Sequence, residues 1–201
     1  MILVSASSTT PVPWKNGGGV TRELLRLPAS GDDWTLRISV ADIDADGPFS
    51  PFPGVTRWFA VLEGAGVRLA WPDRVRDVRR GDDPLRFDGA DAPGCDLIAG
   101  PTRDLNVMVH SHRADALVTP ATFLDEAEPG TSPGFGFFAL EALTLHGFGH
   151  TPATMPALSL AWCESPSRAT GAWWIEPSQD KGAAQEHTVP GWWIRLLPPT
   201  R

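Results

Sequence analysis

Apolar and polar residues alternate along much of this chain with a period of two, the pattern of a β-strand whose two faces differ in environment. The clearest case is residues 34–41, where four apolar side chains share one face: Trp34, Leu36, Ile38 and Val40. Comparable segments predict strands at 56–63, 66–71, 85–87, 95–99, 105–110, 158–163, 171–176 and 192–197. Only residues 121–128 have a helical pattern, and it is short. The fold class is therefore predicted to be all-β.

Turn-forming residues separate these segments. The chain holds 20 glycines and 20 prolines, which are spread from end to end instead of forming one linker. Many short strands are typical of β-sandwiches and barrels, and a closed barrel leaves an interior for a small ligand. The composition changes near residues 114–134, where Pro, Thr and acidic residues precede a new apolar segment. We therefore expect two β-rich domains, residues 1–113 and residues 114–201.

The charge and the cysteines exclude several classes of protein. The formal net charge is −7 at pH 7, opposite in sign to the basic surface of a nucleic-acid-binding protein or of one that docks on anionic lipid. Cys95 and Cys163 form neither a CxxC motif nor a disulfide framework, and no apolar stretch is long enough to cross a bilayer. We expect a cytoplasmic protein with no nucleic-acid partner and no membrane contact; a homodimer stays an open alternative.

A glycine-rich segment, residues 13–24, is the densest local signal. Its three consecutive glycines, Gly17–Gly19, allow positive φ angles and a close approach of the backbone to a ligand. Such a run can direct several N–H groups at an anion, although its spacing is not that of a P-loop. In the strand that follows, Thr21 and Glu23 share a face. The alternative is a plain flexible turn.

A second segment, residues 100–110, places polar groups on one face of a predicted strand. The period of two puts Asp104, Asn106, Met108 and His110 together, with Leu and Val residues on the opposite face. The apolar face suits a packed layer between sheets. The polar face fits the interior of a barrel and a solvated outer surface equally well.

Arg57 is the third signal, because it shares a strand face with Phe59 and Val61. A buried guanidinium must be paired, and either Asp104 or Glu23 could be the partner; otherwise it must meet the carboxylate of a ligand. The alternative is an arginine at a strand end that reaches water.

The histidines do not indicate a metal site. The pairs His110-x-His112 and His146-x3-His150 have spacings that can bring two imidazoles together, but neither has a third ligand at a helpful distance. The chain has no Gly-x-Ser-x-Gly elbow, and both cysteines lie beside apolar residues, which indicates core positions. We expect no metal, no other cofactor and no catalytic residue of the nucleophilic type.

Over residues 14–108 the chain resembles the HutD/Ves family of cupin-fold proteins. The matching segments are Trp14-Lys15-Asn16-Gly17-Gly18-Gly19-Val20-Thr21-Arg22-Glu23, Trp34-x-x-Arg37-Ile38-Ser39-x-Ala41, Asp46-Gly47-Pro48-Phe49-Ser50-x-Phe52-x-Gly54-x-x-Arg57, Leu62-Glu63-Gly64-x-Gly66, Phe87-x-Gly89 and Gly100-Pro101-x-x-Asp104-Leu105-Asn106-x-Met108. Residues 114–201 match only loosely. The chain departs from the family after Met108, where His110 and Ser111 stand in place of the usual basic residues.

The resemblance implies a bicupin, with two cupin-like barrels of the double-stranded β-helix or jelly-roll type in one chain. The first barrel would carry the pocket, and the second would be degenerate. The family is associated with histidine utilisation and with binding an N-formyl or N-formimino glutamate. Carried over position by position, the ligand-binding candidates are Lys15, Asn16, Thr21, Glu23, Arg37, Ser39, Arg57, Asp104, Asn106 and Met108, to which we add His110.

Three functions remain in competition at this point. The leading one is a binding or regulatory protein for a small acidic metabolite, with Arg57 and Lys15 gripping a carboxylate. The rival is a metal-free hydrolase or isomerase with Glu23 or Asp104 as general base and His110 as acid. A strongly raised pKa at either acid, deep in a pocket, would favour the enzyme. The third is an interaction protein whose pocket is vestigial.

Overall fold

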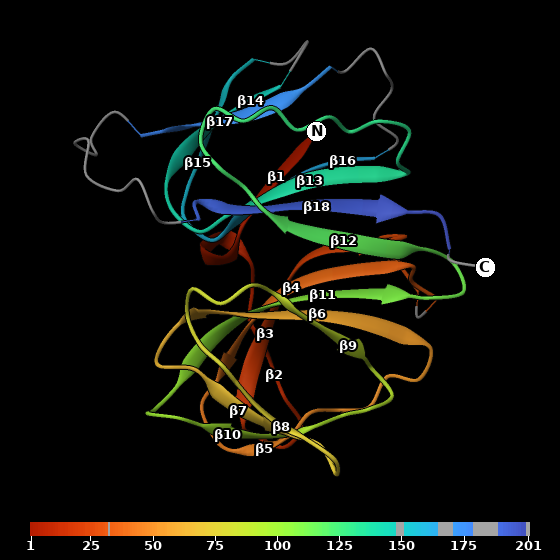
Figure 1. The fold of residues 1–201 in the computed structure, drawn as a ribbon, viewed down its shortest axis with the longest axis vertical. Helices are drawn as coiled ribbons and strands as arrows, with labels where there is room; N and C mark the ends of the chain where they lie inside the picture. The colour runs from red at the N-terminus through yellow and green to blue at the C-terminus, as the bar shows by residue number, and fades with distance from the viewer. Residues whose placement is uncertain (32, 148–150, 165–170, 179–188, 200–201) are drawn as a thin grey trace. The chain divides into compact units, whose positions relative to one another are not determined.

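The structure of the chain is a computed structural model, which describes residues 1–31, 33–147, 151–164, 171–178 and 189–199 (Figure 1). These residues form β-strands and one 3₁₀ turn, η1 (Ala6–Ser8), without an α-helix. The all-β class is confirmed. None of the helices among the described residues is long and apolar enough to span a membrane. The chain divides into two compact units, one made of Thr9–Asp115 with Pro199 and one made of Met1–Ser8 with Ala116–Pro198.

The 9–115 unit consists of two antiparallel sheets. Its larger sheet has the order β2 (Val12–Pro13), β3 (Gly19–Leu27), β4 (Leu36–Ile43), β11 (Thr102–His110), β6 (Val55–Glu63) and β9 (Leu85–Asp88). The smaller has the order β5 (Gly47–Pro48), β10 (Gly94–Leu97), β7 (Val67–Ala70) and β8 (Val75–Val78). Both orders are linear, so the described strands form two open sheets and not the closed barrel that we expected.

The core of the 9–115 unit lies between these sheets. Phe59 and Val61 of β6 pack in one cluster with Val67 and Leu69 of β7 and with Cys95 of β10. The alternation of β4 and β11 buries the opposite strand faces as well, because Ile38, Val40, Val107 and Val109 are all fully buried. Both faces of β4 and β11 are thus covered. The polar side chains on one of these two faces therefore lie inside the protein.

The 116–198 unit is also built from two antiparallel sheets. Its larger sheet has the order β1 (Ile2–Ser5), β16 (Ser159–Glu164), β13 (Gly134–Ala139), β18 (Gly191–Leu197) and β12 (Asp115–Pro120). The smaller has the order β15 (Ala153–Met155), β14 (Leu143–Gly147) and β17 (Trp173–Pro177). Phe135, Phe137, Trp173 and Trp193 dominate its core, so two of the nine tryptophans of the chain are core residues of this unit.

Two sequence-based expectations need correction here. Residues 121–128 are not helical: Ala127 forms a β-bridge with Trp173, and Leu124 has a φ of 66°. Pairing to β17 therefore outweighs a weak helical propensity. The first residues do not belong with residues 9–113 either, because β1 lies beside β16, with Ile2 opposite Trp162.

Candidate functional site

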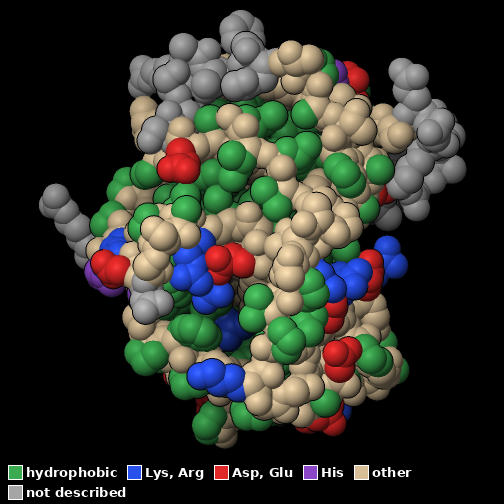
Figure 2. Space-filling view, turned by 180° about the vertical axis from the view of Figure 1, so that it is seen from behind, with side chains coloured by type: hydrophobic (Ala, Val, Ile, Leu, Met, Phe, Trp, Pro, Cys, Tyr) green, Lys and Arg blue, Asp and Glu red, His purple; other side chains and the backbone are tan. Residues whose placement is uncertain are grey.

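A cavity of about 450 Å³ opens into the 9–115 unit. Figure 2 shows it as a hollow in this unit, with Lys and Arg side chains at its rim and in its depth. The volume suits a small organic ligand. The sequence-predicted residues that line it are Lys15, Asn16, Thr21, Arg37, Ser39, Arg57, Asn106 and Met108.

Strand register explains why residues so distant in sequence meet here. On β11, Asn106 lies opposite Ser39 of β4 and opposite Phe59 of β6. One step along the same face, Met108 lies opposite Arg37 and Arg57. Since alternate residues of neighbouring strands point to the same side of a sheet, Arg37, Ser39, Arg57, Asn106 and Met108 form one row facing the cavity.

Arg57 is the central group of the cavity. Its side chain is only 6% exposed, and Nη2 donates a hydrogen bond of 2.6 Å to Oδ1 of Asn106. The guanidinium carbon lies 4.6 Å from the ring centre of Phe49 and 5.3 Å from that of Phe87. Burial lowers the pKa of Arg57 to about 10, against a smaller effect of Cys95 that raises it. The side chain remains a cation at neutral pH, close to two aromatic rings.

No carboxylate of the described residues neutralises this cation. Its only side-chain hydrogen bond is to the neutral amide of Asn106, and its Nε, although buried, has no partner among the described atoms. Neither of the two candidate partners, Asp104 and Glu23, forms an ion pair with Arg57 in the described part of the chain. Because Oδ1 of Asn106 is engaged, its amide nitrogen and the hydroxyl of Ser39 supply further hydrogen-bond donors in this row. The floor of the cavity thus favours an anion.

Arg37 adds a second guanidinium to the cavity wall, and Lys15 adds an exposed amine at its mouth. Arg37 donates from Nε to Glu23 at 2.9 Å, and Arg26 binds both oxygens of Glu23 at 3.0 and 3.1 Å. Burial raises the pKa of Glu23, but the two guanidinium groups outweigh it, so that the pKa is lowered overall. Glu23 is consequently a counterion of two arginines and does not line the cavity. A carboxylate with a lowered pKa and both oxygens engaged by arginines is a poor general base.

Asp104 and His110, two further predicted site residues, also lie off the cavity lining. Asp104 is fully buried, and its Oδ2 accepts a hydrogen bond of 2.8 Å from Thr102. His110, at the other end of β11, packs against Trp34 with the rings tilted by 44° and 4.4 Å between ring centres. Burial and the nearby His112 and Arg113 lower the pKa of His110. The acid–base pair of the enzyme hypothesis is therefore not assembled around the cavity.

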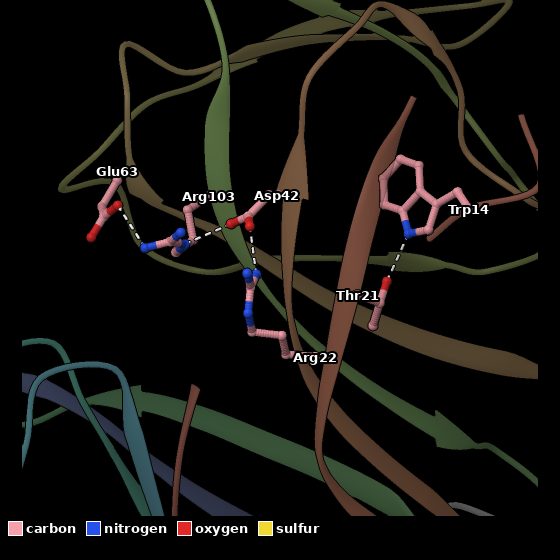
Figure 3. Close-up of polar contacts among 6 residues, drawn as sticks. All are labelled: Trp14, Thr21, Arg22, Asp42, Glu63 and Arg103. Carbon is pink, nitrogen blue, oxygen red and sulfur yellow. Dashed lines mark hydrogen bonds and ion pairs between the residues drawn. The ribbon is translucent and has the colours of Figure 1, made fainter. Parts of the chain in front are cut away.

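The glycine-rich segment forms a fixed turn at the rim. The backbone N–H of Trp14 donates to the carbonyl of Gly19 at 2.9 Å, and Gly17 adopts a φ of 72°. The indole Nε1 of Trp14 donates to Oγ1 of Thr21 at 2.7 Å, which holds the ring against β3 (Figure 3). Because Lys15 and Asn16 lie inside this turn, its rigidity positions both at the cavity mouth.

Gly19 is the glycine on which the turn depends most. A Cβ at this position would overlap the backbone carbonyl of Asp42 and press on the Trp14 ring. We expect Gly19→Ala to lower the free energy of unfolding by about 1–3 kcal/mol in chemical denaturation. Gly94→Ala is the control, because a Cβ there would make only ordinary contacts with Ala70. Equal stability of the two variants would contradict a close-packed turn.

An ion-pair network secures the strands from the side opposite the cavity. Asp42 accepts hydrogen bonds from Arg22 at 2.5 Å and from Arg103 at 2.6 Å, and Arg103 also binds Glu63 at 3.1 Å (Figure 3). Burial raises the pKa of Asp42, but both guanidinium groups lower it, with a net decrease. The network connects β3, β4, β11 and β6, and therefore helps to fix the register of the cavity strands.

Sequence reasoning missed the apolar lining of the cavity. Phe49 and Phe52 come from the loop that follows β5, and Cys95 comes from β10. A loop has no periodicity from which to infer direction, so the aromatic residues of Gly47–Gly54 were the only signal available. Burial raises the pKa of the Cys95 thiol to about 12, and Asp104 contributes in the same direction. Cys95 is therefore a neutral wall group, not a nucleophile.

Within the described residues no three His, Cys, Asp or Glu side chains are grouped as metal ligands. His112 lies 5.4 Å from His110 between ring centres without a third ligand. His146 stacks on Trp174 and contacts Glu176 at 3.0 Å, whereas His150 lies outside the described residues.

Comparison with known proteins gives a family match over most of the chain. The HutD family model matches residues 6–173. A 21.2 kDa protein of the hutC 3′ region in Pseudomonas putida is 37% identical over 112 residues, 55% of this chain and 59% of that protein. Protein Ves of Citrobacter koseri is 36% identical over 109 residues, 54% and 57% of the two chains. The chain thus spans somewhat more than half the length of these curated relatives.

Solved structures extend the similarity to the whole fold. A conserved protein of unknown function from Pseudomonas aeruginosa PAO1 has a TM-score of 0.80 at 25% identity, covering 99% of this chain and 98% of its own. HutD from Pseudomonas fluorescens SBW25, in a formate condition, has a TM-score of 0.79 at 24% identity and 99% coverage of both chains. Oxalate decarboxylase from Lactobacillus farciminis, in a formate complex, has a TM-score of 0.60 at 10% identity, covering 100% and 87%. The fold is cupin-like.

Proposed function

The chain belongs to the HutD family, and on that premise we propose that its 9–115 unit binds a small carboxylate metabolite at Arg57. The observation that carries this proposal is a buried cation in a cavity, without a carboxylate partner among the described residues. A guanidinium presents parallel N–H donors that match the two oxygens of a carboxylate. A ligand of that kind supplies the counterion that Arg57 lacks.

The size of the cavity and its second positive charge narrow the range of ligands that fit. A volume of about 450 Å³ exceeds what formate needs, and Arg37 and Lys15 provide positive charge closer to the mouth. A molecule with one carboxylate on Arg57 and another acidic group near Arg37 would neutralise the positive charge at both places in the cavity. N-formyl and N-formimino glutamate have this composition, and a relative from the hutC region supports a role in histidine utilisation. The role is regulatory or sensing, because neither predicted general base lines the cavity.

Two further inferences concern the architecture of the chain and the cellular compartment in which it acts. We infer that the chain is a bicupin, since each unit consists of two antiparallel sheets around its own hydrophobic core. The 9–115 unit would be the ligand-binding half. Cys95 and Cys163 are both free thiols, which supports action in the reducing cytoplasm.

Titration calorimetry with formate, glutamate, N-formylglutamate and N-formiminoglutamate tests the ligand proposal. We expect at least one of the two N-substituted glutamates to bind the wild type. Arg57→Met should weaken that binding by about ten- to a hundredfold, the effect of one charge-assisted hydrogen-bond pair. Arg76→Met is the matched control, because Arg76 is an exposed residue of β8 away from the cavity. The proposal is wrong if none of these acids binds, or if Arg57→Met and Arg76→Met bind equally well.

A further inference from the structure

Asp104 is a buried ionisable group that carboxylate binding at Arg57 does not use directly. It is 0% exposed, and it lies two residues from Asn106 on the same face of β11. Oδ2 accepts from the Thr102 hydroxyl, whereas Oδ1 is buried without a hydrogen-bond partner among the described atoms. No basic side chain in the described part of the chain forms an ion pair with it. An ionised carboxylate in this position would be both desolvated and unpaired.

The groups around Asp104 do not compensate such a charge. Its cross-strand neighbours are Ala41 of β4 and Val61 of β6, and the negative charge of Asp42 acts on it as well. Burial, opposed by the Thr102 hydrogen bond and assisted by Asp42, raises the pKa of Asp104 to about 7. Asp104 therefore changes between neutral and ionised forms close to neutral pH.

The Cys95 thiol connects Asp104 to the cavity. Cys95 lines the cavity, and the charges of both Asp104 and Arg57 act on it, together with those of Asp46 and Asp96. Asp104 and the anion site at Arg57 are thus in electrostatic reach of the same wall group. In a low-dielectric interior, a negative charge at one of these sites disfavours a negative charge at the other.

Resting on the carboxylate site at Arg57, we propose that this cavity binds its anion together with a proton, which is held by Asp104. The neutral acid leaves the positive potential of Arg57 undiminished, whereas ionised Asp104 opposes the incoming carboxylate. By linkage, the bound carboxylate favours protonation of Asp104 as strongly as protonation favours binding. The ligand site therefore responds to pH although Arg57 itself stays charged.

The test measures affinity and proton uptake for whichever of formate, glutamate, N-formylglutamate and N-formiminoglutamate bind the wild type, since their carboxylates all remain ionised across the pH range used. For the wild type we expect affinity to fall about tenfold between about pH 6 and pH 8.5, which corresponds to ~1.4 kcal/mol. Calorimetry in two buffers with different ionisation enthalpies should show uptake of a fraction of a proton near pH 7. In Asp104→Asn, which keeps the shape of the acid without its charge, both the pH dependence and the proton uptake should disappear.

The outcomes separate this inference from the proposed function. If none of the four acids binds the wild type at about pH 6, the carboxylate site itself is wrong. If they bind with the same affinity across the range and without proton uptake, the site stands and the role of Asp104 is wrong. The wild-type proton uptake decides the matter even if Asp104→Asn does not fold. A pH dependence that persists in a folded Asp104→Asn protein would also overturn the inference.

Discussion

Arg57→Met is expected to make the ligand-free protein more stable while weakening carboxylate binding. Arg57 is almost fully buried without a counterion among the described residues, and its lowered pKa, about 10, means that folding disfavours the charged form. Because this pKa lies below that of an unfolded arginine, the cost applies at every pH below about 10. Methionine is flexible enough to fill the space between Phe49 and Phe87 without a charge. We expect the free energy of unfolding to rise by about 1–3 kcal/mol at neutral pH.

Urea denaturation of the ligand-free proteins measures this effect. Arg76→Met should change the free energy of unfolding by no more than about 0.5 kcal/mol, because Arg76 is exposed. A less stable Arg57→Met protein would mean that the Asn106 hydrogen bond and the ring contacts outweigh the burial of the charge. Arg57 would then be a structural residue as well as a ligand anchor.

Asp104→Asn is expected to remove a large pH dependence of stability. The pKa of Asp104 is raised from 3.8 to about 7 in the folded protein, so the folded state holds its proton more tightly than the unfolded state. The contribution of Asp104 to stability is therefore greatest below about pH 4, falls as the pH rises toward about 7, and is level above that. Between about pH 5 and pH 8.5 this group alone lowers the free energy of unfolding by on the order of 2–3 kcal/mol.

Denaturation of wild type and Asp104→Asn at these two pH values isolates the contribution of Asp104, because all other titrating groups are shared. The variant should be the more stable protein at about pH 8.5, and the difference should be smaller at about pH 5. Parallel pH profiles for the two proteins would show that Asp104 is already ionised, or already compensated, in the folded state.

Strand periodicity predicted the faces of the cavity strands but not the extent of the cavity. The alternation of residues 34–41 correctly places Arg37 and Ser39 together, because a period of two is a property of any strand. The same rule groups Asp104 and His110 with Asn106, yet the cavity covers only the middle of β11. Where a cavity ends depends on the opposing sheet and loops, which periodicity within one strand does not describe.

Other differences between the sequence-based predictions and the structure have local causes. A register shift of β3 between Glu23 and Leu25 interrupts the alternation there, and Glu23 pairs with Arg26 and Arg37. The short strands β2 and β5 have two residues each, too few for a pattern to be detected. The partner of Arg57 proved to be the Asn106 amide and not an acid, which a pairing rule based on charge could not anticipate.

The position of β1 has a consequence for how the chain is made. Ile2 pairs with Trp162, so the ribosome produces β1 long before its neighbour β16 exists. The segment Thr9–Asp115 contains all ten strands of the two cavity sheets, and those strands emerge from the ribosome as one uninterrupted stretch. During synthesis the cavity sheets can pair while the backbone of β1 remains unpaired until β16 has been made. Slow translation beyond residue 115 would lengthen this interval, and with it the time in which a chaperone can bind the exposed amino-terminal strand.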